Sequence, residues 1–131
     1  MAIIGQQQPV NDTNQKDDDD NIRRCVSQLL LALAPDKVAA IIEIFLDWQP
    51  PHWSQLASAV QSADYAVVIN EAHLLRGSSA TLGARRLAAA LERLEATAQA
   101  QGTLQARWDE AEPLFPPTLA ALRARKAELQ D

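Results

Sequence analysis

Residues 72–84 read Ala-His-Leu-Leu-Arg-Gly-Ser-Ser-Ala-Thr-Leu-Gly-Ala. In this stretch His73 is followed three residues later by a cation, Arg76, and four residues later by Gly77. In an α-helix these positions lie on one face, about one turn apart. An imidazole can act as a nucleophile, a guanidinium can neutralise phosphoryl oxygens, and a glycine leaves space beside them. The stretch therefore predicts a helical phosphorylation site at His73.

The apolar pattern around His73 predicts the direction in which its ring points. At about 100° per residue, one sector of the helix gathers Val68, Ala72, Leu75, Ser79 and Leu82. We expect this sector to face the core, with His73 more than about 90° away from its centre. The line of the helix that holds His73 also holds the small residues Ala66, Ala80 and Ala84, and Ile69 borders it. The ring should therefore stand exposed above a low platform that another protein can approach.

As a whole, residues 72–84 resemble the signature of histidine phosphotransfer (HPt) domains, roughly Ala-His-x-Leu-Lys-Gly-Ser-(Ser/Ala)-x-x-Leu-Gly-Ala. The resemblance covers about residues 22–125, because Val38–Leu46 is similar to the helix that precedes the family's site and Leu87–Glu95 to the helix that follows it. It implies a four-helix bundle with extra short helices.

The resemblance also implies a role for each residue of the motif. His73 corresponds to the phosphoacceptor, Arg76 to the charge-stabilising lysine and Gly77 to the residue that leaves steric access. Arginine in place of lysine keeps the charge but changes the reach and the donor geometry. We expect partners to dock near four residues around this motif, namely Ile69, Asn70, Ala80 and Ala84.

In HPt domains the histidine accepts a phosphoryl group from a receiver-domain aspartate and passes it to another receiver. The catalytic carboxylates and Mg²⁺ belong to the receiver, so the resemblance implies a carrier with no catalytic site, cofactor or metal of its own. Two alternatives stay open from sequence. The chain could be a helical adaptor that binds receivers or kinases without carrying phosphate, or the substrate domain of a chemotaxis-type kinase, labelled from ATP. A hybrid histidine kinase is a further possible partner or parent protein.

The composition of the chain favours a single all-α domain. The chain has 131 residues, and its hydrophobic residues are mostly alanine and leucine, with few aromatics. Several amphipathic segments joined by short turns predict an antiparallel helical bundle. Combined with what the resemblance implies, the expected fold is an antiparallel up-down four-helix bundle with an additional short N-terminal helix. Neither a Gly-rich phosphate loop nor a nucleophile elbow occurs in the sequence, so an enzyme is poorly supported.

Apolar spacing and helix-breaking residues predict where the helices begin and end. A stripe from Ile22 to Leu33 ends at Pro35, and Asp36 is placed to cap a second helix. Pro50 and Pro51 should break or bend that second helix. A third helix is expected from about Asp64 to Leu82, with Gly83 as a stop or a close-packing point. A fourth is expected from Arg85 to Gln101, with Gly102 as a left-handed terminator, and a last helical region, interrupted by prolines, from Leu104 to Leu129.

Residues 1–21 differ in composition from the domain expected over residues 22–131. They hold five aspartates and one lysine, which account for most of the net charge of −5, and they lack apolar periodicity. They predict a flexible acidic tail or linker. The near-neutral remainder offers no basic surface for nucleic acid and no affinity for anionic membranes. Because Cys25 is the only cysteine and no signal segment is evident, we expect a cytoplasmic monomer whose partners are proteins.

Overall fold

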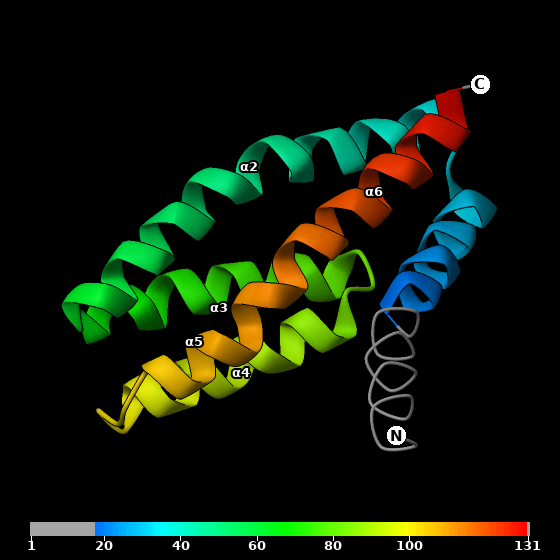
Figure 1. Ribbon diagram of the computed structural model, residues 1–131. Coiled ribbons are helices and arrows are strands. Elements are labelled where there is room, and N and C mark those ends of the chain that lie inside the picture. Colours follow the sequence, from blue (N-terminus) through cyan, green and yellow to red (C-terminus); the bar gives the residue numbers. More distant parts are fainter. Residues whose placement is uncertain (1–17, 131) are drawn as a thin grey trace, which may run out of the picture.

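The computed structural model describes residues 18–130, and within this range the chain forms helices, turns and no strand. The N-terminal helix covers residues 18–32. It is followed by α2 (Pro35–Ser62), α3 (Tyr65–Thr81), α4 (Arg85–Gln99), α5 (Gln105–Ala111), the 3-10 turn η1 (Glu112–Leu114) and α6 (Phe115–Gln130). Figure 1 shows this order along the chain. The predicted all-α class is confirmed.

The long helix α2 is central to the packing, because it contacts both α3 and α6, while α3 packs along α4 and α4 contacts α5 (Figure 1). The largest fully buried apolar side chains come from every major helix: Ile22, Val38, Ile42, Leu56, Val68, Leu75, Leu82, Leu87, Leu91, Leu94 and Leu122. Near one end of the core, the Trp53 ring stacks on Phe115 with the ring centroids 4.2 Å apart and contacts Trp108 at 5.0 Å. Burial of these side chains is the main force that holds the helices together.

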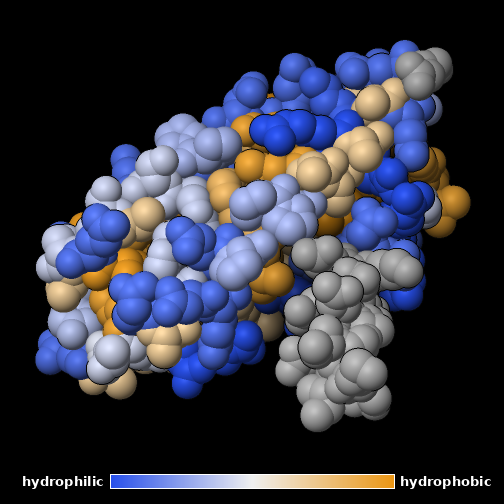
Figure 2. Space-filling model, viewed as in Figure 1, coloured by the Kyte–Doolittle hydropathy of each residue, from blue (hydrophilic) through white to orange (hydrophobic). Residues whose placement is uncertain are grey.

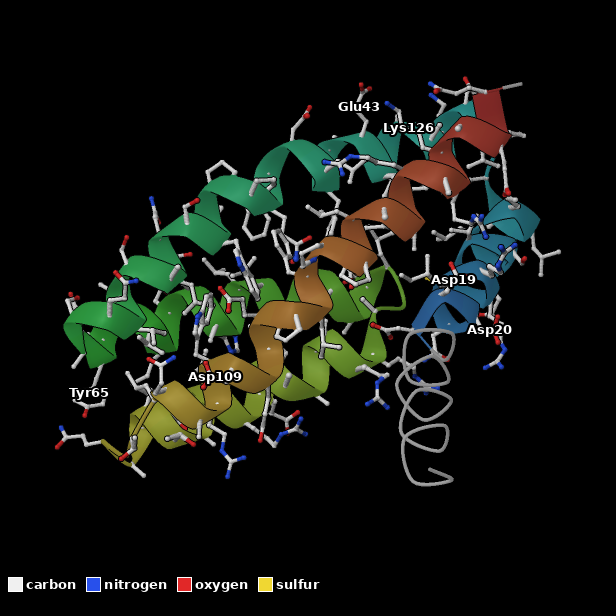
Figure 3. All side chains as sticks on the ribbon, in the orientation of Figure 1. Asp19, Asp20, Glu43, Tyr65, Asp109 and Lys126 are labelled. Carbon is white, nitrogen blue, oxygen red and sulfur yellow. The ribbon has the colours of Figure 1, made fainter. Side chains whose placement is uncertain are left out.

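Two polar contacts link elements that are distant in the sequence (Figure 3). Lys126 Nζ on α6 donates to Glu43 Oε1 on α2 over 3.3 Å. At the other end of the molecule, the Tyr65 hydroxyl at the start of α3 donates to the carbonyl of Gly102, just beyond α4, over 3.4 Å. The Lys126–Glu43 ion pair is exposed and contributes little to stability, whereas the Tyr65 hydrogen bond is partly buried.

The turn between α3 and α4 depends on Gly83. Its φ of +88° lies in the left-handed region, which favours glycine, and the following amide of Ala84 donates back to Ser79 O over 2.8 Å. The N-terminal helix packs closely on this turn. A Cβ added to Gly83 would lie 2.7 Å from both Asn21 O and Cys25 Cβ. Gly83 is therefore both the helix stop and the close-packing point that the sequence predicts.

Asp18 ties the N-terminal helix to α4. Its buried carboxylate accepts a hydrogen bond from the backbone amide of Arg86 over 3.0 Å, so it caps a helix whose own N-cap residue, Ala84, makes no side-chain bond. The predicted domain boundary at residue 22 is wrong, since residues 18–21 are helical and the domain includes them. Residues 1–17 of the predicted tail lie outside the described residues.

Three expected features of the helix ends and of α2 differ in the structure. The prolines do not break α2: although Pro50 and Pro51 each remove a backbone donor, the helix continues through them, because the apolar residues on both sides are buried in one core. Asp36 does not cap α2, because the helix begins one residue earlier with Pro35 at its first position. After α4, Gln101 rather than Gly102 adopts the left-handed conformation, with φ of +55°.

Cys25 lies half-buried against the α3–α4 turn, where its Sγ donates to Thr81 O over 3.2 Å. Burial raises the pKa of this thiol above its ordinary value, which makes it a poor nucleophile. Among the helices of residues 18–130, none is both long enough and apolar enough to cross a bilayer.

Gly83→Ala is expected to destabilise the domain by about 2 to 4 kcal/mol, because a side chain is strained at positive φ and would clash with the N-terminal helix. Gly77→Ala is the matched control. An added Cβ there meets no heavy atom within 4 Å, so the substitution should stabilise α3 by about 0.5 to 1 kcal/mol. Urea or thermal unfolding measures both variants. Equal stability of the two would contradict the close packing at the turn.

Candidate functional site

Helix α3 presents His73 to solvent. The five residues predicted to face the core, Val68, Ala72, Leu75, Ser79 and Leu82, are all buried. The His73 side chain, on the opposite face, is 60% exposed. The predicted exposure of the ring is confirmed, and it follows from the amphipathic pattern because α2 and α4 cover only the apolar side of the helix.

Arg76 and Gly77 lie beside the ring as their spacing predicts. The Arg76 Nη2 atom is 3.0 Å from His73 Nδ1. Gly77 is exposed, and the space next to its Cα is empty, since an added Cβ would meet no heavy atom within 4 Å. A cation and an open approach therefore flank the imidazole, which are the two features that transfer of an anionic group to the ring requires.

Glu95 on α4 completes the site, and sequence reasoning missed it. Its Oε2 atom is 3.2 Å from His73 Nδ1, and its Oε1 atom accepts from Arg76 Nε over 3.2 Å. The Glu95 side chain is only 13% exposed. The sequence does contain one indication of this contact, because His73 and Glu95 each lie eleven residues from Ala84. If two helices pack along each other from a turn at Ala84, these two residues lie at the same height along the helix pair.

The contacts that the described residues make with the His73 ring all fall on Nδ1. The second ring nitrogen, Nε2, is thus left as the nitrogen that an incoming group can approach. Because the ring is held through one nitrogen only, Arg76 and Glu95 can orient it without covering the other. The site is an exposed imidazole with a cation and a carboxylate at its Nδ1 edge, an arrangement that can serve as a nucleophile at Nε2.

Glu71, two residues before His73, lies on a different face of α3. Its buried carboxylate is 2.8 Å from Nδ1 of the second histidine, His52, on α2. The indole of Trp48 packs on His52, with ring centroids 4.1 Å apart. The His52–Glu71 pair therefore joins α2 to α3. A structural role for His52 agrees with the sequence, in which no cation or glycine follows it at the spacing seen after His73.

The residues predicted to bind partners divide into two groups. Asn70 and Ala80 are exposed, and Ile69 is half-buried against the core beside them, so these three remain accessible around His73. Ala84 is fully buried, and its prediction as a docking residue is wrong. The helical projection that placed Ala84 on the line of His73 does not apply to it, because α3 ends at Thr81 and Ala84 lies in the turn.

Arg85 and Arg86 do not assist at the ring. Arg85 lies at the start of α4, ten residues and thus about 15 Å along the helix from Glu95. The two arginines line a separate surface cleft together with Arg93 and Glu110, and the Arg93 Nε atom donates to Glu110 Oε1 there over 3.2 Å. The local positive charge at His73 therefore comes from Arg76.

An apolar groove of about 450 Å³ runs between α2 and α3 next to the site. It is lined by Ile41, Ile44, Phe45, Trp48, Leu74, Ser78, Thr81 and Leu82. Leu74 adjoins His73 in the sequence, and the Ile44 side chain on the rim is unusually exposed for its type, at 68%. The groove is not evident from the sequence, because the apolar residues of α2 that line it have the spacing of a core-facing helix.

Comparisons with known proteins bear on this site. A family model described as the Hpt domain matches residues 40–131. A similar solved structure is the crystal structure of histidine-containing phosphotransfer protein B from Pseudomonas aeruginosa PAO1, with a TM-score of 0.69 and 23% sequence identity over 82% of this chain and 91% of that chain. At this identity the likeness concerns the fold. No curated protein matches the chain significantly. With the family model spanning most of its length, the chain belongs to the Hpt domain family, whose members transfer phosphoryl groups through a histidine in phosphorelays.

Proposed function

We propose that Nε2 of His73 is the phosphoacceptor, which takes a phosphoryl group from a receiver-domain aspartate and passes it to the aspartate of another receiver. The observation that carries this proposal is an exposed imidazole whose contacts fall on Nδ1, next to an unobstructed glycine. Phosphoryl transfer depends on in-line positioning and on neutralisation of charge, and it needs little covalent chemistry from the carrier.

The transfer step balances without a general base. The lone pair of Nε2 attacks phosphorus while the bond from phosphorus to the aspartyl oxygen breaks, and the electron pair of that bond returns to the carboxylate. The proton on Nδ1 stays in place, so the phosphorylated ring carries a positive charge next to Glu95. Arg76, with a third of its side chain exposed, is placed to contact the phosphoryl oxygens.

The same proposal assigns catalysis to the partner. A carrier of this kind supplies a nucleophile and a cation, while the Mg²⁺ and the acidic residues that activate the phosphoryl group come from the receiver domain. The protein then has no turnover of its own and needs no cofactor. We place it in the cytoplasm as a monomer, where receiver domains or a hybrid histidine kinase are its partners and neither nucleic acid nor membrane is bound.

The fold that we assign is an antiparallel up-down four-helix bundle of α2, α3, α4 and α6, to which the N-terminal helix is added. Short connections after α2 and after α3 support this arrangement, because helices joined by two or three residues pack side by side in opposite directions. In this bundle α2 and α4 pack on α3 from two sides, which keeps the helical segment from His73 to Gly77 rigid.

The groove between α2 and α3 can add a docking surface to the patch around Ile69 and Ala80. Its apolar lining reaches Leu74, next to His73, and an apolar helix of a receiver could bury Ile44 there. A relay must release each partner, and an interface of this limited extent suits a transient complex.

A phosphorylation assay tests the acceptor. Receiver domains encoded in the same genome are loaded with ³²P-acetyl phosphate and mixed with the protein. The chain should gain an acid-labile, alkali-stable label that His73→Gln abolishes, while His52→Gln retains it, because His52 is held in a pair with Glu71. Binding without label would favour the adaptor, and label that comes only from ATP and a kinase domain would favour the chemotaxis-type substrate.

Gly77→Leu tests the steric access. Far-UV circular dichroism should change little and the melting temperature should not fall, since the position is exposed and leucine favours a helix. The transfer rate from the same receivers should nevertheless fall at least about 100-fold, because the side chain would occupy the approach to Nε2. Gly77→Ala adds only a methyl group, so its transfer rate should fall much less. Unimpaired transfer to the leucine variant would refute the access argument.

Ile44→Asp tests the groove as a docking surface. An unpaired carboxylate at an apolar contact should raise the Kd for a receiver domain at least about tenfold, as measured by calorimetry. Leu31→Asp is the control, because Leu31 is 88% exposed on the N-terminal helix and does not line the groove. Apolar surface over the end of that helix is visible at the right edge of Figure 2. Equal effects of both variants would count against the groove.

A further inference from the structure

Two contacts at His73 Nδ1 demand opposite states of the same atom. The Arg76 guanidinium is a donor only, so its Nη2, 3.0 Å away, requires a lone pair on Nδ1. The Glu95 carboxylate is an acceptor, so its Oε2, 3.2 Å away, requires a proton on Nδ1. A neutral imidazole carries a proton on one nitrogen and a lone pair on the other. It can therefore satisfy only one of these two partners at a time.

The choice between them decides whether the ring can react. When Nδ1 accepts from Arg76, the proton is on Nε2, and the exposed nitrogen has no lone pair with which to attack. When Nδ1 donates to Glu95, the lone pair is on Nε2. Arg76 and Glu95 thus compete for Nδ1, and their competition sets the fraction of the nucleophilic tautomer.

The attachment of Arg76 allows it to change partner. Its Nε atom donates to Glu95 Oε1 over 3.2 Å, which anchors the guanidinium while Nη2 points at the ring. A third of the side chain is exposed, so Nη2 can turn toward a group that arrives from solvent. Ionised phosphoryl oxygens form stronger hydrogen bonds with a guanidinium than a neutral ring nitrogen does.

We propose that Arg76 and Glu95 form a tautomer switch that keeps His73 unreactive until a phosphoryl group arrives. In the free protein Arg76 donates a hydrogen bond to Nδ1, and Nε2 is protonated. The phosphoryl oxygens of a docked donor draw Nη2 away, and Nε2 releases its proton to water. Nδ1 takes up a proton from water, keeps it, and donates a hydrogen bond to Glu95. This inference rests on His73 as the phosphoacceptor, and it makes Glu95 a positioning residue.

The second histidine of the chain is an internal reference for the switch. Nδ1 of His52 lies 2.8 Å from Glu71 Oε2, and no arginine or lysine contact to its ring is found among residues 18–130. With a carboxylate and no competing cation, His52 should carry its proton on Nδ1 in every variant. The two imidazoles of one molecule should therefore show opposite tautomers in the free protein.

The experiment is ¹⁵N NMR of both imidazoles at about pH 8, where an ordinary histidine is neutral. In the unmodified protein His73 should be mainly protonated on Nε2. Arg76→Met should change the tautomer ratio at least about tenfold toward Nδ1, and Arg76→Lys, which restores a donor, should reverse part of that change. Glu95→Met should leave His73 protonated on Nε2. Unchanged His52 signals and circular dichroism will show that each variant is folded.

A free protein already protonated on Nδ1 of His73, or a ratio that Arg76→Met does not change, would overturn the switch. The tautomer measurement uses no partner, so it separates this inference from the proposed function. Label on His73 without a tautomer change would contradict only the switch. A tautomer change in a protein whose His73 takes no label from any receiver would support the switch at Nδ1 and contradict the proposed function.

Discussion

The close contact at the α3–α4 turn sets the geometry on which the site depends. Gly83 provides the left-handed conformation that reverses the chain, and the N-terminal helix packs on the space that a side chain would fill. From this turn α3 and α4 run together, and the buried leucines of α4 keep them in one register. In that register His73 on α3 and Glu95 on α4 meet. A slip by one residue would rotate Glu95 by about 100° away from the ring.

Helix α3 keeps two residues that are unfavourable for stability on its exposed face. Gly77 costs a helix interior up to about 1 kcal/mol relative to alanine, and an exposed histidine contributes no burial. Both residues are exposed and lie outside the apolar side of α3, so their cost does not spread into the core. Departures from the locally most stable choice are expected at functional sites. The same face offers small residues around the ring where a core-facing helix would carry leucine.

Features that depend on one helix or one turn can be predicted from the sequence, whereas features that depend on tertiary contacts cannot. The direction of His73, its neighbours Arg76 and Gly77, and the stop at Gly83 belong to the first kind, because their periodicity is visible in the sequence. Glu95 and Asp18 belong to the second kind. Each acts on a residue 22 or 68 positions distant, and nothing in the local pattern marks a carboxylate as a partner of a particular ring or amide.

Local rules also fail where burial overrides them. Pro50 and Pro51 remove two donors from one stretch of α2, and by local preference the helix should end there. It continues because Phe45, Trp53 and Leu56 are anchored in one core on both sides of the prolines. Ala84 shows the opposite error, because it was predicted to be exposed and is buried. The helical projection assumes that α3 continues past Thr81, whereas the chain turns there and packs this small residue into the interior.

The two carboxylate–imidazole pairs of the chain show how environment separates structure from function. Both place a glutamate oxygen near Nδ1, at 2.8 Å in the His52 pair and 3.2 Å in the His73 pair. His52 is shielded by Trp48 and bonded to a buried carboxylate, so its pair joins two helices. His73 differs in two physical respects, since its ring is exposed and a guanidinium contests its Nδ1. With exposure alone, the proposed nucleophile would always be available. In the proposed switch, the added cation makes its availability depend on an anionic partner, so the ring reacts with a phosphorylated receiver and stays inert without one.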